Sequence, residues 1–96
     1  MPAYMIVTRE GPVGDEAEMA EYQRLNRENP PKVPLKPLAI YGAIEPLAGD
    51  APDGAIVLEF ASVADAKAWY DSAEYQAALP HRQRAADYRM FIVEGL

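Results

Sequence analysis

Apolar residues run together or alternate in four short segments of this chain, and each segment predicts a β-strand. The segments are rich in β-branched and aromatic residues and are bounded by glycine, proline or aspartate, which is the usual signature of strands. They cover residues 3–8, 38–45, 54–60 and 88–94. The first, third and fourth carry apolar side chains at both odd and even positions, so we expect both faces of their sheet to be covered.

Between the first two strands the pattern changes to a helical period. In residues 14–29, Met19, Tyr22 and Leu25 recur every three positions and define one apolar stripe. The following residues, 30–37, include four prolines, a density that neither a helix nor a central strand tolerates. We therefore expect one amphipathic helix followed by an extended, stiff loop.

The region after the third strand predicts a second helix with two interruptions. Ser62 is a good N-cap for this helix. Asp71 and Ser72 are expected to break it, and Ser72 can cap the helical segment that follows. Pro80 should interrupt that segment, with a short helical stretch remaining in residues 81–86.

The order strand, helix, strand, strand, helix, strand predicts an α+β fold of the ferredoxin-like βαββαβ type. Right-handed crossovers would give a four-stranded antiparallel sheet with both helices on one face. We expect a single domain over residues 1–96, which is an ordinary length for one domain. The uncovered sheet face would be apolar, which monomers rarely expose, so we expect two copies to pack these faces together as a homodimer.

Composition narrows the classes of partner. The net charge is −6 and the sequence pI is near 4.6, so nucleic acid and anionic membrane surfaces should be repelled. The chain has no cysteine, which excludes a disulfide framework and a thiolate nucleophile. No apolar run reaches the roughly 20 residues of a membrane span, and the N-terminal stretch lacks the features of a signal peptide. We therefore expect a cytoplasmic protein without nucleic-acid or membrane partners.

Two residues are candidates for proton transfer. His81 is the only histidine, and an imidazole that titrates near neutrality can act as a general acid or base. Glu59 interrupts an apolar strand, where burial would raise the pKa of its carboxyl group and suit it to act as a general base. The alternative for His81 is a surface or packing role. For Glu59 it is an exposed edge position, or an ion pair with Arg82 or Arg89.

Three further residues are candidates for binding a substrate. Trp69 can line a pocket for a flat organic molecule, with core packing as the alternative. Arg82 can hold a carboxylate through two hydrogen bonds, unless it pairs with Glu74 or Asp71. Tyr41, expected on the same sheet face as the strand glutamate, can hydrogen-bond a substrate oxygen. No spacing of histidine and acidic residues supplies metal ligands, and no glycine-rich phosphate loop occurs, so we expect neither a metal nor another cofactor.

Several short motifs cluster in the C-terminal half of the chain. They are VLEF at 57–60, AWYDS at 68–72, EYQ at 74–76, Arg82, and VEG at 93–95. In these motifs the chain closely resembles the DUF1330 family of small bacterial proteins, and the N-terminal strand and helix fit more loosely. The resemblance implies a dimeric α/β barrel with ferredoxin-like halves, but no settled activity. Relatives by fold include monooxygenases without metal or prosthetic group, muconolactone-type isomerases and stress-responsive barrel proteins.

Two hypotheses about function follow. The first is a cofactor-independent enzyme, isomerase-like or monooxygenase-like, that acts on a small organic metabolite. In such an enzyme Glu59 or His81 would move a proton. Tyr41 and Trp69 would shape the pocket, and Arg82 would orient an anionic group. The second hypothesis is a non-catalytic homodimer that binds a small molecule or has a structural role, and it does not require these residues to meet at one cavity.

Overall fold

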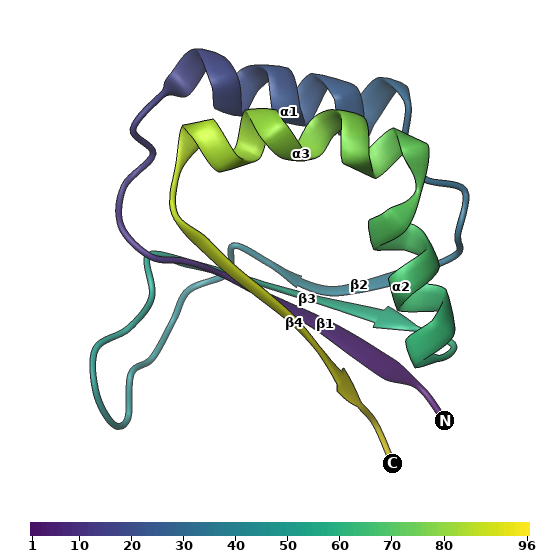
Figure 1. The fold of residues 1–96 in the computed structure, drawn as a ribbon. Coiled ribbons are helices and arrows are strands. Elements are labelled where there is room, and N and C mark those ends of the chain that lie inside the picture. The colour runs from purple at the N-terminus through teal and green to yellow at the C-terminus, as the bar shows by residue number, and fades with distance from the viewer.

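Helices cover one face of a four-stranded antiparallel sheet, and the other face is uncovered (Figure 1). The computed structural model describes residues 1–96, and the strand order is β2-β3-β1-β4. This is the ferredoxin-like arrangement that the sequence predicts, with its second helical region divided in two. The elements are β1 (Ala3–Arg9), α1 (Glu16–Glu28), β2 (Lys36–Ile40), β3 (Gly54–Phe60), α2 (Val63–Asp71), α3 (Ala73–Ala85) and β4 (Tyr88–Glu94).

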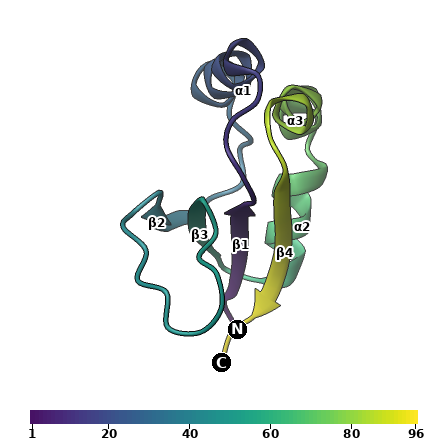
Figure 2. The ribbon, with the colours of Figure 1, turned by 90° about the vertical axis from the view of Figure 1, so that its left-hand side faces the viewer.

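The two longer helices, α1 and α3, lie side by side over the sheet, and Figure 2 shows them almost end-on. The shorter helix α2 stands at one end of this layer, between α3 and the sheet (Figure 1). It contacts both α3 and the three strands β1, β3 and β4. Side chains from the helices and the sheet therefore meet in the space between the two layers.

Alternation along the central strand β1 sends its side chains to opposite faces of the sheet, as predicted. Met5 and Val7 are buried on the helix side, and Ile6 lies on the open side. The antiparallel pairing places Ile6 between Val57 of β3 and Phe91 of β4. The open face is therefore apolar at its centre.

The edge strand β2 differs from the prediction. It covers Lys36–Ile40 rather than residues 38–45, so it begins inside the proline-rich segment that was expected to be a loop. Pro37 is tolerated because β2 lies at the edge of the sheet, where only one side of a strand is paired. The register is irregular after Pro37, and the strand stops where Tyr41 takes a left-handed backbone conformation with a φ of 52°.

Serine side chains begin the second and third helices. Ser62 caps α2, and Ser72 separates α2 from α3 because its hydroxyl accepts a hydrogen bond from the N–H of Tyr75. The predicted break is thus confirmed.

The interruption expected at Pro80 is wrong, since α3 continues through it. The carbonyl of Gln76 loses its helical donor there, but both residues are exposed, so water can take the donor's place.

Aromatic rings form the centre of the core. Phe60, Trp69 and Tyr75 are buried, with ring centroids 6.0 Å apart for the first pair and 4.3 Å apart for the second. On α1, Met19 is buried and Tyr22 packs against this cluster, which confirms the predicted apolar stripe. Each such buried side chain stabilises the fold by about 1.5–3 kcal/mol relative to exposure. No helix of this molecule has the length and apolar character needed to traverse a membrane.

Candidate functional site

A small cavity lies between the helix layer and the sheet. Its volume is about 50 Å³, and eight of its nine lining residues are hydrophobic. All three helices contribute to the wall, as do β1, β3, β4 and the residue that follows β2. The lining residues are Val7, Tyr22, Tyr41, Ile56, Leu58, Trp69, Arg82, Tyr88 and Met90.

Arg82 is the one charged residue of this wall, and only 7% of it is exposed. Its guanidinium carbon lies 4.7 Å from the centre of the Tyr88 ring, and Nη1 donates to the sulfur of Met90 at 3.2 Å. Nε is buried without a hydrogen-bond partner. The alternative ion pair with Glu74 or Asp71 is not formed. Nε is thus an unsatisfied buried donor, and the guanidinium has a thioether and a ring face as its neighbours instead of a carboxylate.

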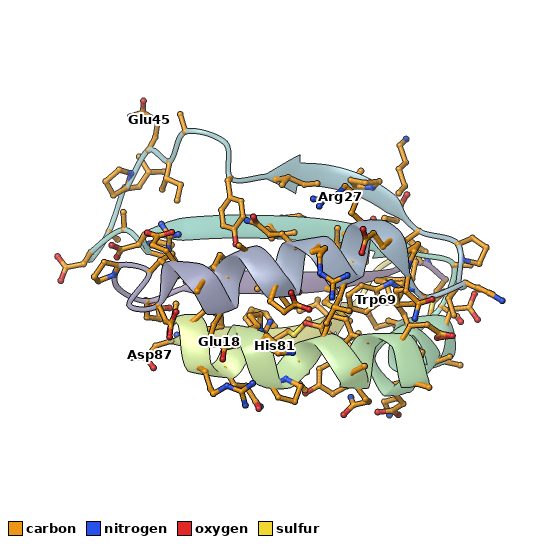
Figure 3. The ribbon with its side chains drawn as sticks, turned by 90° about the horizontal axis from the view of Figure 1, so that it is seen from above. Glu18, Arg27, Glu45, Trp69, His81 and Asp87 are labelled. Atoms are coloured by element: carbon orange, nitrogen blue, oxygen red, sulfur yellow. The ribbon has the colours of Figure 1, made fainter.

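An open pocket of about 200 Å³ lies on the other side of Arg82. Arg82 and Tyr88 line both this outer pocket and the inner cavity, so the two residues form a partition between them. Asp87, which follows α3 (Figure 3), lines the outer pocket but forms no ion pair with Arg82.

Three tyrosines of the cavity wall take part in hydrogen-bonded tyrosine pairs: Tyr41 with Tyr88, and Tyr22 with the core residue Tyr75. The hydroxyl oxygens of Tyr41 and Tyr88 are 3.0 Å apart, and those of Tyr22 and Tyr75 are 3.1 Å apart. Burial and the hydrogen bond to Tyr88 raise the pKa of Tyr41, and burial raises the pKa of Tyr75. Both phenols therefore stay protonated at neutral pH and are suited to donate hydrogen bonds rather than to accept protons.

The structure brings together the three residues that the sequence suggested for substrate binding. Tyr41, Trp69 and Arg82 line one cavity, although they come from a loop, α2 and α3. Figure 3 shows Trp69 between α1 and α3 in the view from above. Because Trp69 also stacks against Tyr75, it both packs the core and lines the cavity.

Glu59 lies on the open face of the sheet, away from the cavity. Its neighbours on the adjacent strands are Tyr4 and Lys36, and it forms no ion pair with an arginine. The expectation that Glu59 and Tyr41 share a sheet face is wrong. The strand β2 ends before Tyr41, whose ring instead lines the cavity on the helix side.

His81 lies in the seam between α1 and α3 (Figure 3) and does not line the cavity either. Its Nδ1 is 2.5 Å from a carboxylate oxygen of Glu18, and Nε of Arg84 donates to the other oxygen at 3.0 Å. The hydrogen bonds from Arg84 and then His81 lower the pKa of Glu18. This cluster ties the two helices together across the outer surface.

Six of the nine lining residues were not recognised as site residues from the sequence, among them Tyr22, Tyr88 and Met90. Tyr88 and Met90 alternate on β4 with the open-face residues, and Tyr22 belongs to the apolar stripe of α1. Strand parity and helical period were the available signals, but they also describe ordinary core positions. The structure groups no three or more His, Cys, Asp or Glu side chains in a way that could hold a metal ion.

Known protein families and solved structures include relatives of this chain. The family model described as "Domain of unknown function (DUF1330)" matches residues 2–96. The chain belongs to the DUF1330 family. The match confirms the resemblance carried by the C-terminal motifs and extends it through the N-terminal strand and helix. No curated protein matches this DUF1330 chain in sequence.

Solved structures share the DUF1330 chain's fold at low identity. A protein of unknown function from Rhodopseudomonas palustris is 21% identical with a TM-score of 0.67, over 99% of this chain and 82% of that one. An ethyl tert-butyl ether D (EthD) family protein from Bacillus halodurans is 17% identical with a TM-score of 0.63, over 100% of both chains. A protein from Bacteroides fragilis, described as dimeric with a ferredoxin-like fold, is 17% identical with a TM-score of 0.59. The match covers 98% of this chain and 96% of that one. These likenesses confirm the ferredoxin-like fold.

Proposed function

We propose that this DUF1330 protein binds a small organic acid in the cavity beneath α1 and α3, with the acid's carboxylate on Arg82. The observation that carries the proposal is that Arg82 is only 7% exposed and its guanidinium has no carboxylate partner. Burial of an unpaired charge costs on the order of several kcal/mol, so its retention favours a functional role. A ligand carboxylate would replace the Met90 sulfur as acceptor and could bind two guanidinium donors at once.

The remaining wall suits an apolar ligand body. Val7, Leu58 and Trp69 supply hydrophobic contact, and within the Tyr41–Tyr88 pair the hydroxyl that accepts the mutual hydrogen bond can donate to a ligand oxygen. Mostly apolar walls with a few converging polar groups are typical of small-molecule sites. Such a site favours an aromatic or short aliphatic acid over a sugar or a nucleotide.

The same wall limits the catalysis available to a cofactor-independent enzyme. It contains no carboxylate, imidazole, thiol or amine, so a bound substrate meets no side chain that accepts a proton at neutral pH. An isomerase-like or monooxygenase-like enzyme at this cavity would use Arg82 and Tyr41 to stabilise negative charge on a substrate oxygen. The presence of Arg82 and Tyr41 in the wall of one cavity favours this second candidate function. Glu59 and His81 have no part in it, because both lie outside the cavity.

We also propose that the open sheet face joins two copies of the chain. Phe91 and Val93 of β4 are 44% and 46% exposed there, beside Ile6 and Tyr4 of β1. Each 100 Å² of apolar surface buried would contribute about 2.5 kcal/mol before the costs of association. The dimeric description of the Bacteroides fragilis protein supports the same kind of assembly.

Thermal unfolding in the presence of small acids tests the binding proposal. Formate, acetate, benzoate and phenylacetate serve as probes, and the corresponding neutral amides serve as controls for apolar binding. At least one acid should raise the melting temperature of the wild type but not that of Arg82→Met. The corresponding amide should leave both melting temperatures unchanged. At an acid concentration of about 100 Kd, binding should stabilise the wild type by about 2.7 kcal/mol. Arg27→Met, which removes an exposed arginine of α1 (Figure 3), should respond as the wild type does. Equal responses of the wild type and Arg82→Met would refute the site.

Mass spectrometry of the same incubations separates binding from catalysis. A product that forms with the wild type, and not with Tyr41→Phe or Arg82→Met, would support the enzyme. Stabilisation by an acid that is recovered unchanged would support the binding protein.

A further inference from the structure

Tyr41 closes the cavity on its solvent side. The residue is 45% exposed, yet it lines the same cavity as Arg82 and Trp69. The side chain therefore separates bulk water from the cavity. We infer that Tyr41 is a gate, which swings out to admit an acid to Arg82 and thereby determines which acids the site accepts. This inference rests on the proposed binding function.

The size of the closed cavity requires such a movement. A volume of about 50 Å³ can hold a carboxylate-sized group but no aromatic body, whereas small-molecule sites commonly occupy about 300 Å³ or more. Trp69 and Leu58 are each 8% exposed and belong to the packed core, which resists displacement. Tyr41 is the most exposed residue of the wall, so its side chain is the one that can move outward.

Three contacts hold the ring of Tyr41 in place, and all can be released without unfolding the protein. Its hydroxyl pairs with that of Tyr88 at 3.0 Å, and the guanidinium carbon of Arg9 lies 5.7 Å from the ring centre. The ring also rests on Gly54, where an added Cβ would lie 2.7 Å from two ring carbons. An exposed hydrogen bond or cation–π contact is worth only about 1 kcal/mol, so opening costs little.

The backbone at Tyr41 is suited to this movement. Its left-handed conformation, with a φ of 52°, costs about 1–2 kcal/mol for a residue with a side chain and interrupts the regular extended backbone of the strand. β2 ends at the preceding residue, and the mostly exposed segment 42–53 follows it (Figure 2). The N–H of Tyr41 still donates to the carbonyl of Ala55 at 2.9 Å. The backbone is thus anchored to β3 while the ring is free to rotate outward.

The single tryptophan provides a test that needs no ligand, because Trp69 lines the cavity. Tyr41→Ala removes the ring that closes the cavity. Gly54→Ala adds a Cβ that displaces the ring of Tyr41 from its contact with residue 54. Both substitutions should raise the acrylamide quenching constant of Trp69 fluorescence roughly twofold or more, because local opening admits the quencher. Gly42→Ala is the matched control, since a Cβ there meets nothing within 4 Å. Circular dichroism confirms that each variant is folded.

Stopped-flow binding of benzoate, followed by the same fluorescence, links the gate to the site. Faster association in Tyr41→Ala and Gly54→Ala than in the wild type, together with stronger quenching, supports the inference. Unchanged quenching and unchanged rates, with benzoate still binding through Arg82, would overturn the gate and leave the binding site intact. Stronger quenching with no acid bound by any variant would overturn the proposed function while Tyr41 remained a movable cover.

Discussion

Nη1 of Arg82 lies 3.2 Å from the sulfur of Met90, and this thioether is the only side-chain acceptor of a hydrogen bond from the buried guanidinium. Sulfur is a weak acceptor, so the positive charge is poorly compensated when no ligand is bound. An anion that binds here would therefore compensate the charge and gain binding energy. The unliganded protein is less stable than it would be without the unpaired charge.

The substitution Arg82→Met should therefore make the free protein more stable. It replaces a buried, unpaired charge by an apolar side chain of similar length, and the free energy of unfolding should rise by about 1–4 kcal/mol. Urea denaturation measures the change, with Arg27→Met as the exposed control that should alter stability little. A clear loss of stability in Arg82→Met would show that the guanidinium is already well compensated.

Acid should weaken the contact between α1 and α3 through Glu18. Hydrogen bonds from Arg84 and His81 hold its pKa below the ordinary value of 4.5. The unfolded chain therefore takes up the proton at a higher pH than the folded protein, so this contribution to stability is present above pH 4.5 and is lost as the pH falls through the lowered pKa. Glu18→Gln should lose less stability than the wild type between pH 6 and about pH 3. Glu16→Gln, on the same helix but without an ion pair, should follow the wild type.

Alkali should act through Tyr75, which is fully buried and hydrogen-bonded to Tyr22. Burial raises its pKa above the ordinary value of 10.0, so the unfolded chain loses this proton first and stability falls as the pH rises past that value. Near neutrality Tyr75→Phe should cost about 0.5–1.5 kcal/mol for the lost hydrogen bond. By about pH 11 the difference between variant and wild type in chemical denaturation should shrink or reverse. A constant difference across this range would contradict the assigned burial.

The proposed self-interface can be tested at Phe91. Phe91→Arg places a charge at the centre of the open face, next to Ile6, and should convert a dimer into a monomer in sedimentation equilibrium at micromolar concentration. Leu47→Arg is the matched control, because Leu47 is 99% exposed and belongs to the loop between β2 and β3 rather than to a strand of this face. A monomeric wild type would contradict the interface directly.

Local pattern was sufficient for most of the fold and for part of the site. β3 and β4 have the predicted bounds because their strand period and flanking turns are explicit in the sequence. The observed bounds of β2 differ from the predicted ones because an edge strand tolerates its prolines. The linear sequence pattern does not show which strand lies at the edge of the sheet. Arg82 and Trp69 were recognised by their chemistry, but their meeting depends on how α2 and α3 dock onto the sheet. Glu59 lies on the open face, as its strand parity indicates, whereas Tyr41 was wrongly expected on that face because the end of β2 was placed too late.

Binding of an acid to Arg82 can be observed at the guanidinium itself. In ¹⁵N-labelled protein, the Nε–H resonance of Arg82, assigned by its absence from Arg82→Met, reports a donor that has no partner in the free protein. Titration with the acid that stabilises the protein most should shift this resonance and saturate, and the corresponding amide should leave it unchanged. If the acid binds and stabilises the protein while the Arg82 resonance stays in place, the cavity is not its site and the account is contradicted.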